Sequence, residues 1–113
     1  MQRDPAYFLD IRDAARLAIQ YVSGKSYEDF LSDIQCQDAV IRRIALIGEA
    51  ARRTSEETRS EHPQFPWREM VSMRNLVIHE YDDIDLSVVW DTVNKSLREL
   101  LALLDDVLPA DPP

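Results

Sequence analysis

The chain has few glycines, cysteines and histidines, and no long apolar run. It contains two glycines, one cysteine and two histidines among 113 residues. Scarce glycine, with no sustained alternation of β-branched and polar residues, excludes a typical sheet protein and predicts an all-α chain. No apolar run approaches the roughly 20 residues that a membrane-spanning helix needs. We therefore expect a helical protein that is not associated with a membrane.

The single cysteine limits both redox chemistry and metal binding. Cys36 alone cannot form an internal disulfide or a cysteine-based zinc site. The first residues also lack the apolar core and cleavage site of a secretory signal. We expect a cytoplasmic protein in which Cys36 is a small, buried or half-buried apolar side chain. Glycine-rich phosphate loops, His-Glu-x-x-His pairs and calcium loops are missing, so neither a metal nor a cofactor is predicted.

Charge is unevenly distributed along the chain. The formal net charge of −8 argues against a nucleic-acid partner, because phosphate binding depends on clustered Lys and Arg. Segment 42–74 nevertheless carries seven basic against five acidic residues, a net +2, which leaves −10 for the rest. A solvated helix face would explain any one of these cations. All seven are arginines, the side chain best suited to paired phosphate contacts: Arg42, Arg43, Arg52, Arg53, Arg59, Arg68 and Arg74.

Apolar residues recur at the three- and four-residue steps of amphipathic helices. A first helix is predicted to begin at Asp4-Pro5 and to end at Ser23-Gly24. Short connections between helices predict an antiparallel up-and-down four-helix bundle with one or two short extra helical turns. One domain over 1–108 and a disordered tail over 109–113 are expected. The last helix, capped by Asp85, carries a regular apolar seam: Leu86, Trp90, Val93, Leu97, Leu100, Leu104 and Val107.

A second long helix ends near Thr54, and its start is ambiguous. Ser26 and Asp29 have the spacing of a capping box, although the usual second residue is Glu or Gln. Asp33 is an alternative start. Residues 26–33 are therefore either the first turns of this helix or a separate short helix.

Gly48 lies inside the second helix, where glycine costs about 1 kcal/mol relative to alanine. We expect the close approach of another helix to compensate for this cost. Glu49 beside it is either an exposed charge or a buried hydrogen-bond acceptor.

Two prolines interrupt the helical pattern between residues 62 and 66. His62 is expected to be an exposed loop residue here and is a poor catalytic candidate. Pro66 occupies the first turn of a third helix, which is apolar around much of its circumference and must be covered on more than one side. A second copy of the chain is the first candidate for that cover. Its apolar residues are Trp67, Met70, Val71, Met73, Val77 and Ile78.

The residues with the richest chemistry lie between positions 74 and 81, in Arg-Asn-Leu-Val-Ile-His-Glu-Tyr. His79 can take a proton from a ribose 2′-hydroxyl or give one to a leaving 5′-oxygen. Arg74 can stabilise charge on the phosphate oxygens, and Asn75 can donate to phosphate or help hold the imidazole. These groups suit metal-free RNA cleavage that leaves a 2′,3′-cyclic phosphate and a 5′-hydroxyl, with DNA resistant.

Helix geometry separates the two main candidates. In a continuous α-helix, Arg74 and His79 leave the axis about 140° apart. The helix ends near His79, or Arg74 reaches round it, or two protomers contribute to one site. In the structural alternative, His79 caps helix carbonyls, Arg74 pairs with a carboxylate, and Tyr81 packs at a helix corner.

The spacing Arg74-Asn75-x-x-x-His79-x-Tyr81 resembles the extended Arg-x4-His motif of HepT-type toxins in the HEPN superfamily. Ser72 departs from the pattern, which has glycine there. Other matching segments cover most of the chain: Ala39-Val40-Ile41-Arg42-Arg43, Ile47-Gly48-Glu49-Ala50, Pro66-Trp67, Asp85-Leu86 and Val89-Trp90.

The resemblance implies a homodimeric ribonuclease toxin of a type VII toxin–antitoxin pair, with both motifs lining one cleft and no metal requirement. By position, Arg74 and His79 are catalytic, Asn75 supports them, and Tyr81 is the modified residue. The implied partner is an MntA-type nucleotidyltransferase antitoxin that transfers AMP from ATP to Tyr81. An adenylyl group there would add negative charge and bulk beside the RNA.

Two other functions remain open. A non-catalytic helper subunit that binds a nucleotidyltransferase and helps present its nucleotide would explain the acidic surface and the apolar third helix. It would not explain why Arg74, Asn75 and His79 occur together. A purely structural bundle is the other possibility. Glu80, Asp82 and Asp83 either weaken RNA binding or attract a basic surface on the partner.

Overall fold

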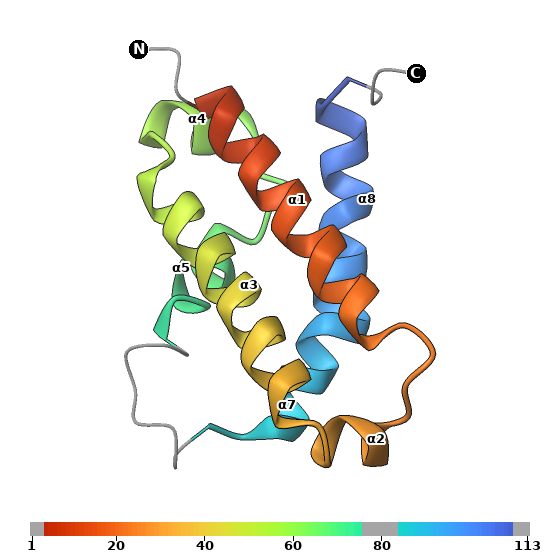
Figure 1. Ribbon diagram of the computed structural model, residues 1–113. Coiled ribbons are helices and arrows are strands. Elements are labelled where there is room, and N and C mark those ends of the chain that lie inside the picture. Colours follow the sequence, from red (N-terminus) through yellow and green to blue (C-terminus); the bar gives the residue numbers. More distant parts are fainter. Residues whose placement is uncertain (1–3, 76–83, 110–113) are drawn as a thin grey trace.

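The computed structural model describes residues 4–75 and 84–109 and contains no strand within them. The chain descends through α1, returns in α3, descends again in α5, and returns through α7 and α8 (Figure 1). This confirms the predicted all-α bundle, and α2 and α4 are its short extra turns. The bounds are α1 (Asp4–Val22), α2 (Tyr27–Leu31), α3 (Ile34–Arg53), α4 (Glu56–Glu61), α5 (Trp67–Ser72), α7 (Leu86–Asp91), the π-helical segment η2 (Thr92–Ser96) and α8 (Leu97–Val107).

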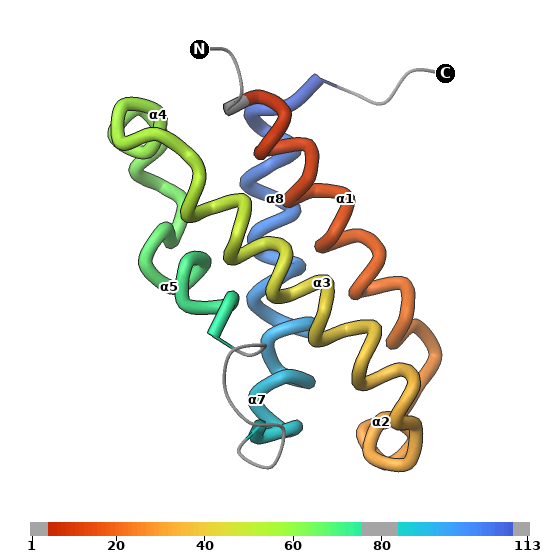
Figure 2. Tube along the Cα trace, turned by 60° about the vertical axis from the view of Figure 1, so that its left-hand side comes forward, coloured from red at the N-terminus to blue at the C-terminus, as the bar shows by residue number. Residues whose placement is uncertain are grey.

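The first helix packs against both α3 and α8, as Figure 2 shows. Ile11, Ala15 and Ala18 are fully buried along it. Small alanines let the neighbouring helices approach closely, and the burial of this stripe supplies much of the hydrophobic stabilisation. The helix ends at Val22, directly before the predicted stop at Ser23-Gly24, and Gly24 has a φ of 76°, which suits glycine best.

The segment 26–33 contains a separate short helix, α2, and not the first turns of α3. The Ser26 hydroxyl accepts from the Asp29 amide at 3.1 Å, and the Ser26 amide donates to the Asp29 carboxylate at 3.1 Å, a reciprocal capping box. Asp33 then caps α3 by accepting from the Cys36 amide at 3.0 Å and from Lys25 at 3.2 Å. These two hydrogen bonds hold the pKa of Asp33 below its usual value.

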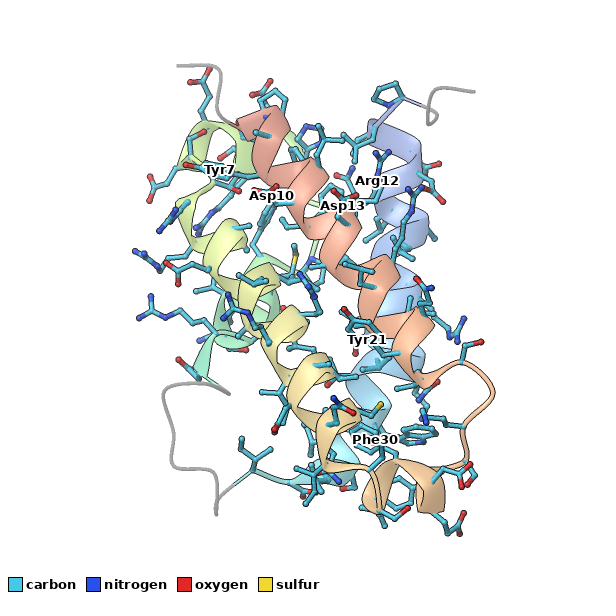
Figure 3. All side chains as sticks on the ribbon, viewed as in Figure 1. Tyr7, Asp10, Arg12, Asp13, Tyr21 and Phe30 are labelled. Atoms are coloured by element: carbon cyan, nitrogen blue, oxygen red, sulfur yellow. The ribbon has the colours of Figure 1, made fainter. Side chains whose placement is uncertain are left out.

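Two buried residues connect helices at this end of the bundle, Phe30 joining α2 to α7 and Cys36 joining α3 to α1. Phe30 is fully buried at the end of the bundle where α2 lies, and its ring centroid is 5.3 Å from that of Trp90 on α7 (Figure 3). Cys36 is buried as predicted, its thiol donating to the Tyr21 carbonyl at 3.5 Å. Burial raises the pKa of this thiol, which keeps it protonated and unreactive.

The final helical arm contains a π-helical segment that its apolar spacing did not predict. Val89, Val93 and Leu97 are fully buried at two successive four-residue steps. In an ideal α-helix such steps would move the side chains gradually around the helix, whereas the wider π turn of η2 keeps them on one side. Val89 therefore occupies the buried position predicted for Trp90, which is half-buried beside α2. Leu100 and Leu104 of the predicted seam are also buried, whereas Leu86 and Val107 at its two ends are half-buried against the core.

His62 is half-buried and not the exposed loop residue that we predicted. It follows α4 and packs edge-on against Phe8 of α1, with ring centroids 5.3 Å apart. Its carbonyl also accepts from the Trp67 indole at 3.0 Å. The prediction failed because the proline-rich connection folds back onto α1, an approach that local sequence does not encode.

The end of α8 is tied to α1. The Arg12 guanidinium, only 8% exposed, donates to the Pro109 carbonyl at 3.3 Å (Figure 3).

None of the helices within 4–75 and 84–109 has the length and apolar content to cross a bilayer. Residues 110–113 of the expected tail lie outside the described residues, and the domain limits of 1–108 stay a prediction.

Candidate functional site

Arg74 lies in a turn that directly follows α5. The helix ends at Ser72, and the Arg74 amide donates to the Val71 carbonyl at 3.3 Å. Arg74 is half-buried and Asn75 is exposed. The helix α5 thus stops before the motif begins. The angle between Arg74 and His79 depends on residues 76–79, which lie outside the described residues.

Gly48 seats this turn on α3. A Cβ atom added at Gly48 would collide with the backbone nitrogen of Arg74 and lie 3.0 Å from its Cα and Cβ. Gly48 itself is buried within α3. The close approach predicted for Gly48 is confirmed, but the approaching segment is the candidate catalytic turn and not a helix.

Glu49 is a negative charge among three arginines beside this contact. Its carboxylate accepts from Arg52 at 2.6 Å and lies 3.6 Å from the Arg53 Nε. The hydrogen bond from Arg52 lowers the pKa of Glu49, and the charges of Arg74 and Arg53 contribute to the same shift. The Glu49 side chain is 36% exposed, so it combines the two roles left open, a partly exposed charge and a hydrogen-bond acceptor.

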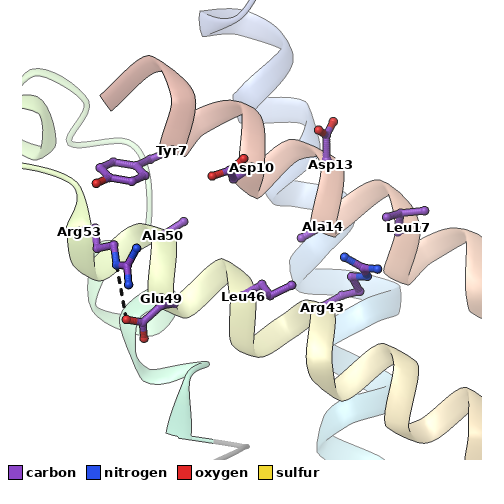
Figure 4. A pocket seen from close by; sticks show the side chains of 10 residues that line it. All are labelled: Tyr7, Asp10, Asp13, Ala14, Leu17, Arg43, Leu46, Glu49, Ala50 and Arg53. Atoms are coloured by element: carbon purple, nitrogen blue, oxygen red, sulfur yellow. Dashed lines mark ion pairs between the residues drawn. The ribbon is translucent and has the colours of Figure 1, made fainter. Parts of the chain in front are cut away.

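A groove of about 470 Å³ lies between α1 and α3 and shares Glu49 with the Arg74 neighbourhood. Figure 4 shows Tyr7 and Asp10 on its α1 wall, with Arg53 on its α3 wall beside Glu49. Acidic side chains face basic ones across this groove. That mixed lining does not favour an anion such as phosphate, so the groove is not the primary candidate for an RNA site.

The other predicted site residues are not brought together by the described part of the chain. His79 and Tyr81, with the acidic Glu80, Asp82 and Asp83, lie outside the described residues. Ser72, which departs from the motif pattern, is exposed at the end of α5 and donates to the Glu69 carbonyl at 2.7 Å. A side chain larger than glycine is therefore accommodated there without burial.

Arg52 and Arg53 did not stand out from the other arginines in the sequence. Their relation to Arg74 arises because α5 approaches α3 at Gly48. The available signal was the Gly48-Glu49 pair within a helix, which indicated a close contact but not the segment making it. Fold and site together define a small helical protein in which the turn containing Arg74 packs on α3 next to Arg52 and Arg53.

The chain belongs to the HepT-like ribonuclease family, since the family model described as Ribonuclease HepT-like matches residues 11–107. The chain is similar to a protein of Thermococcus cleftensis named "Probable ribonuclease HepT", 39% identical over 94 residues, which cover 83% of this chain and 86% of the relative. A relative from Caldanaerobacter subterraneus, provisionally named an RNase, is 32% identical over 108 residues, or 96% of both chains. One from Methanocaldococcus jannaschii, named in the same way, is 34% identical and covers 84% of this chain and 87% of its own length. No solved structure matches the chain.

Proposed function

We propose that the protein is a metal-independent endoribonuclease and the toxin of a type VII toxin–antitoxin pair. The observation that carries this proposal is the close contact between the Arg74 backbone and Gly48 of α3, in a chain that belongs to the HepT-like ribonuclease family. A glycine retained in mid-helix at a cost of about 1 kcal/mol here serves to hold the first residue of the motif. A fixed guanidinium is suited to a transition state that gains charge on phosphate oxygens.

In the proposed reaction the RNA supplies its own nucleophile. The ribose 2′-oxygen attacks the adjacent phosphorus while the bond from phosphorus to the 5′-oxygen breaks. His79 of one protomer accepts the proton of the 2′-hydroxyl, and the protonated His79 of the other gives a proton to the 5′-oxygen. Arg74 stabilises the phosphate oxygens and Asn75 supports the site. The products are a 2′,3′-cyclic phosphate and a 5′-hydroxyl.

The proposed regulation acts at Tyr81. An MntA-type nucleotidyltransferase would transfer AMP from ATP to the phenol oxygen, forming a phosphodiester and releasing pyrophosphate. The added negative charge and bulk would oppose RNA binding beside Arg74. Incubation with this partner and ATP should add AMP mass at Tyr81, and Tyr81→Phe should escape inactivation. Modification confined to another residue would reject this assignment.

The nuclease proposal is tested with purified full-length protein and RNA of defined sequence. Arg74→Ala should reduce the cleavage rate about 10²–10³-fold, as loss of a transition-state donor does, and His79→Ala should do the same or more. Arg98→Ala, exposed on α8, is the matched control and should cleave like the parent. Cleavage should persist in EDTA and should fail on DNA of the same sequence.

Product chemistry separates this mechanism from alternatives. A 2′,3′-cyclic phosphate end supports attack by the 2′-hydroxyl, whereas a 5′-phosphate end would exclude it. Equal cleavage by the parent and Arg74→Ala would show that the site is wrong. If the chain binds the nucleotidyltransferase but never cleaves RNA, the helper-subunit function would be favoured instead.

A further inference from the structure

The groove between α1 and α3 combines an apolar lining with two walls of opposite charge (Figure 4). On the α1 wall Asp10 is exposed, and on the α3 wall Arg43 is half-buried and Arg53 is exposed. Leu46, which lies between the two arginines along α3, leaves 37% of its surface in solvent. The rest of the apolar lining comes from Ala14, Leu17 and Ala50.

The two charged walls do not neutralise each other across the groove. Within residues 4–75 and 84–109, Asp10 and Arg43 form no ion pair, and the Arg53 Nε lies 3.6 Å from Glu49 of its own helix. Hydrogen-bond acceptors on one side and donors on the other are therefore available to a ligand between them. Such a ligand needs N–H donors on one edge, acceptors on another, and apolar faces.

Guanine has this combination of edges, and no other RNA base has it. Its N1–H and N2–H₂ groups are adjacent donors that one carboxylate can accept together. Its O6 and N7 atoms are adjacent acceptors that one guanidinium can contact together. Adenine, cytosine and uracil have no pair of adjacent donors. The groove volume of about 470 Å³ also lies in the usual range for small-ligand sites.

We propose that this groove binds a guanine base, with Asp10 accepting from the N1–H and N2–H₂ groups and Arg43 donating to O6 and N7. The carboxylates that disfavour a phosphate here do not oppose a neutral base. Single-stranded RNA presents unstacked bases whose Watson–Crick and Hoogsteen edges proteins read in this way. The groove is thus a base subsite and not a second phosphate site, and the flat ring covers the exposed side of Leu46.

Glu49 connects the groove to the candidate catalytic turn. It lines the groove, and the preceding residue, Gly48, lies against the Arg74 backbone. Arg53 at the same end can contact a phosphate that leads from the bound base toward Arg74. A guanine near the reacting phosphate would then determine where RNA is cut. This consequence for cleavage rests on the proposed function, whereas guanine binding itself does not.

The first experiment measures binding of labelled 2′-O-methyl hexanucleotides by fluorescence anisotropy. An oligonucleotide with one guanine should bind the full chain about tenfold more tightly than one of the same length without guanine. Asp10→Asn and Arg43→Gln should each remove most of this preference. Asp105→Asn, exposed on α8, is the matched control and should retain it. Circular dichroism of each variant shows whether its helices are retained.

The second experiment changes single atoms of the base. Inosine lacks the N2 amino group that Asp10 would accept from, and 7-deazaguanine lacks the N7 that Arg43 would donate to. Each analogue in place of guanine should weaken binding to the wild type about fivefold, as loss of one hydrogen bond does. Inosine should have no effect in Asp10→Asn, and 7-deazaguanine should have none in Arg43→Gln. A general structural effect of either substitution would not reproduce this pairing.

Guanosine monophosphate distinguishes a base within RNA from a free nucleotide. A base read within RNA predicts that the monophosphate displaces the labelled probe only at much higher concentration, because it lacks the other phosphate contacts. Displacement at an equal concentration would retain the guanine site and assign it to free nucleotides.

The remaining outcomes separate the base site from the nuclease. Equal binding of all the oligonucleotides, or a guanine preference that both Asp10→Asn and Arg43→Gln retain, would overturn the base site. A guanine preference in binding without any RNA cleavage would retain the base site and reject the proposed function. Cleavage and binding that are both indifferent to guanine would do the reverse.

Discussion

At the scale of single residues, the candidate site depends on the lack of a Cβ atom at Gly48. Gly48 has no Cβ, and this alone lets the backbone of Arg74 lie directly on α3. Glu49, the next residue, contributes a negative charge near that turn, and the charge of Arg74 in turn helps to lower the pKa of Glu49. Two consecutive residues of one helix thus determine where the motif arginine is placed and which charge it meets.

Gly48→Ala tests this dependence directly. Alanine favours helix by about 1 kcal/mol, but its Cβ would collide with backbone atoms that cannot rotate away. Overpacking of this kind costs roughly 1–3 kcal/mol, so we expect a net loss of stability and a larger loss of RNA cleavage as Arg74 is displaced. Thermal unfolding and single-turnover cleavage measure the two effects.

Gln35→Ala, exposed near the start of α3, is the control for helix propensity. It should leave both stability and cleavage close to the parent. If Gly48→Ala proved as stable and as active as the parent, the contact with Arg74 would not position the site.

How much of the site the sequence predicts differs from residue to residue. Glycine in mid-helix is costly, so a close contact at Gly48 followed from the sequence. The identity of the contacting segment did not follow, because it depends on how α5 folds back over α3. The roles of Arg52 and Arg53 beside Arg74 could not be predicted for the same reason.

At the scale of elements, α3 is anchored at both ends by side chains that satisfy its free backbone groups. Asp33 accepts from the Cys36 amide at its start, at 3.0 Å. At its end, Arg59 donates to the carbonyls of Ala51 at 2.8 Å and Arg52 at 3.1 Å. Because α3 carries both Gly48 and Glu49, the geometry of its ends affects the site.

The N-terminal cap gives α3 an acid-sensitive end. Hydrogen bonds from Cys36 and Lys25 hold the pKa of Asp33 below the ordinary value of an aspartate. A depressed carboxyl pKa stabilises the fold at pH above the unfolded value, and this contribution is lost as pH falls through the folded value. Asp33→Asn should therefore lower the melting temperature at neutral pH, and the difference from the parent should shrink as the pH falls below the ordinary range of an aspartate.

Asp105→Asn, exposed on α8, is the matched control for removing one carboxylate. Melting curves from pH 7 downward, recorded by circular dichroism, make the comparison. A deficit in Asp33→Asn that stayed constant with pH would show that the charge of Asp33 is unimportant to the cap.

The C-terminal cap makes a second prediction. Arg59→Ala should destabilise the protein by about 1–2 kcal/mol, because it removes a cation from the end of a helix together with its stacking on an aromatic ring. That ring is Trp67, whose centroid is 5.8 Å from the guanidinium carbon. Urea unfolding measures the loss, with the exposed Arg68→Ala as control. Equal stability of the two variants would argue against this role.

The helix boundaries were predictable where a local cap determines them. Ser26 and Asp85 each cap the helix that follows them, as their positions in the sequence indicated. The π-helical segment Thr92–Ser96 was not predicted. The segment packs against α1, and the side chains of Thr92 and Asn94 donate to the Val88 and Trp90 carbonyls. An apolar spacing of four residues fits more than one helix type, so it did not indicate the π turn.

At the scale of the whole molecule, charge decides where RNA can bind. A chain of net charge −8 repels a polyanion, so binding must be confined to the arginine-rich segment 42–74. Arg52 is exposed beside Glu49, and the Arg74 charge also acts on that carboxylate. We therefore expect this part of the surface to make phosphate contacts.

Arg52→Ala tests that placement through the salt dependence of binding. Each phosphate contact on single-stranded nucleic acid contributes a slope of about 0.7 in log K against log salt. Loss of one arginine should reduce the slope by about that amount and weaken binding similarly for different sequences. The probe is fluorescently labelled 2′-O-methyl RNA, which cannot be cleaved by this mechanism, measured by anisotropy. Arg98→Ala on α8 should change neither slope nor affinity, and an equal loss in both variants would mean that RNA binding is not confined to the arginine-rich segment.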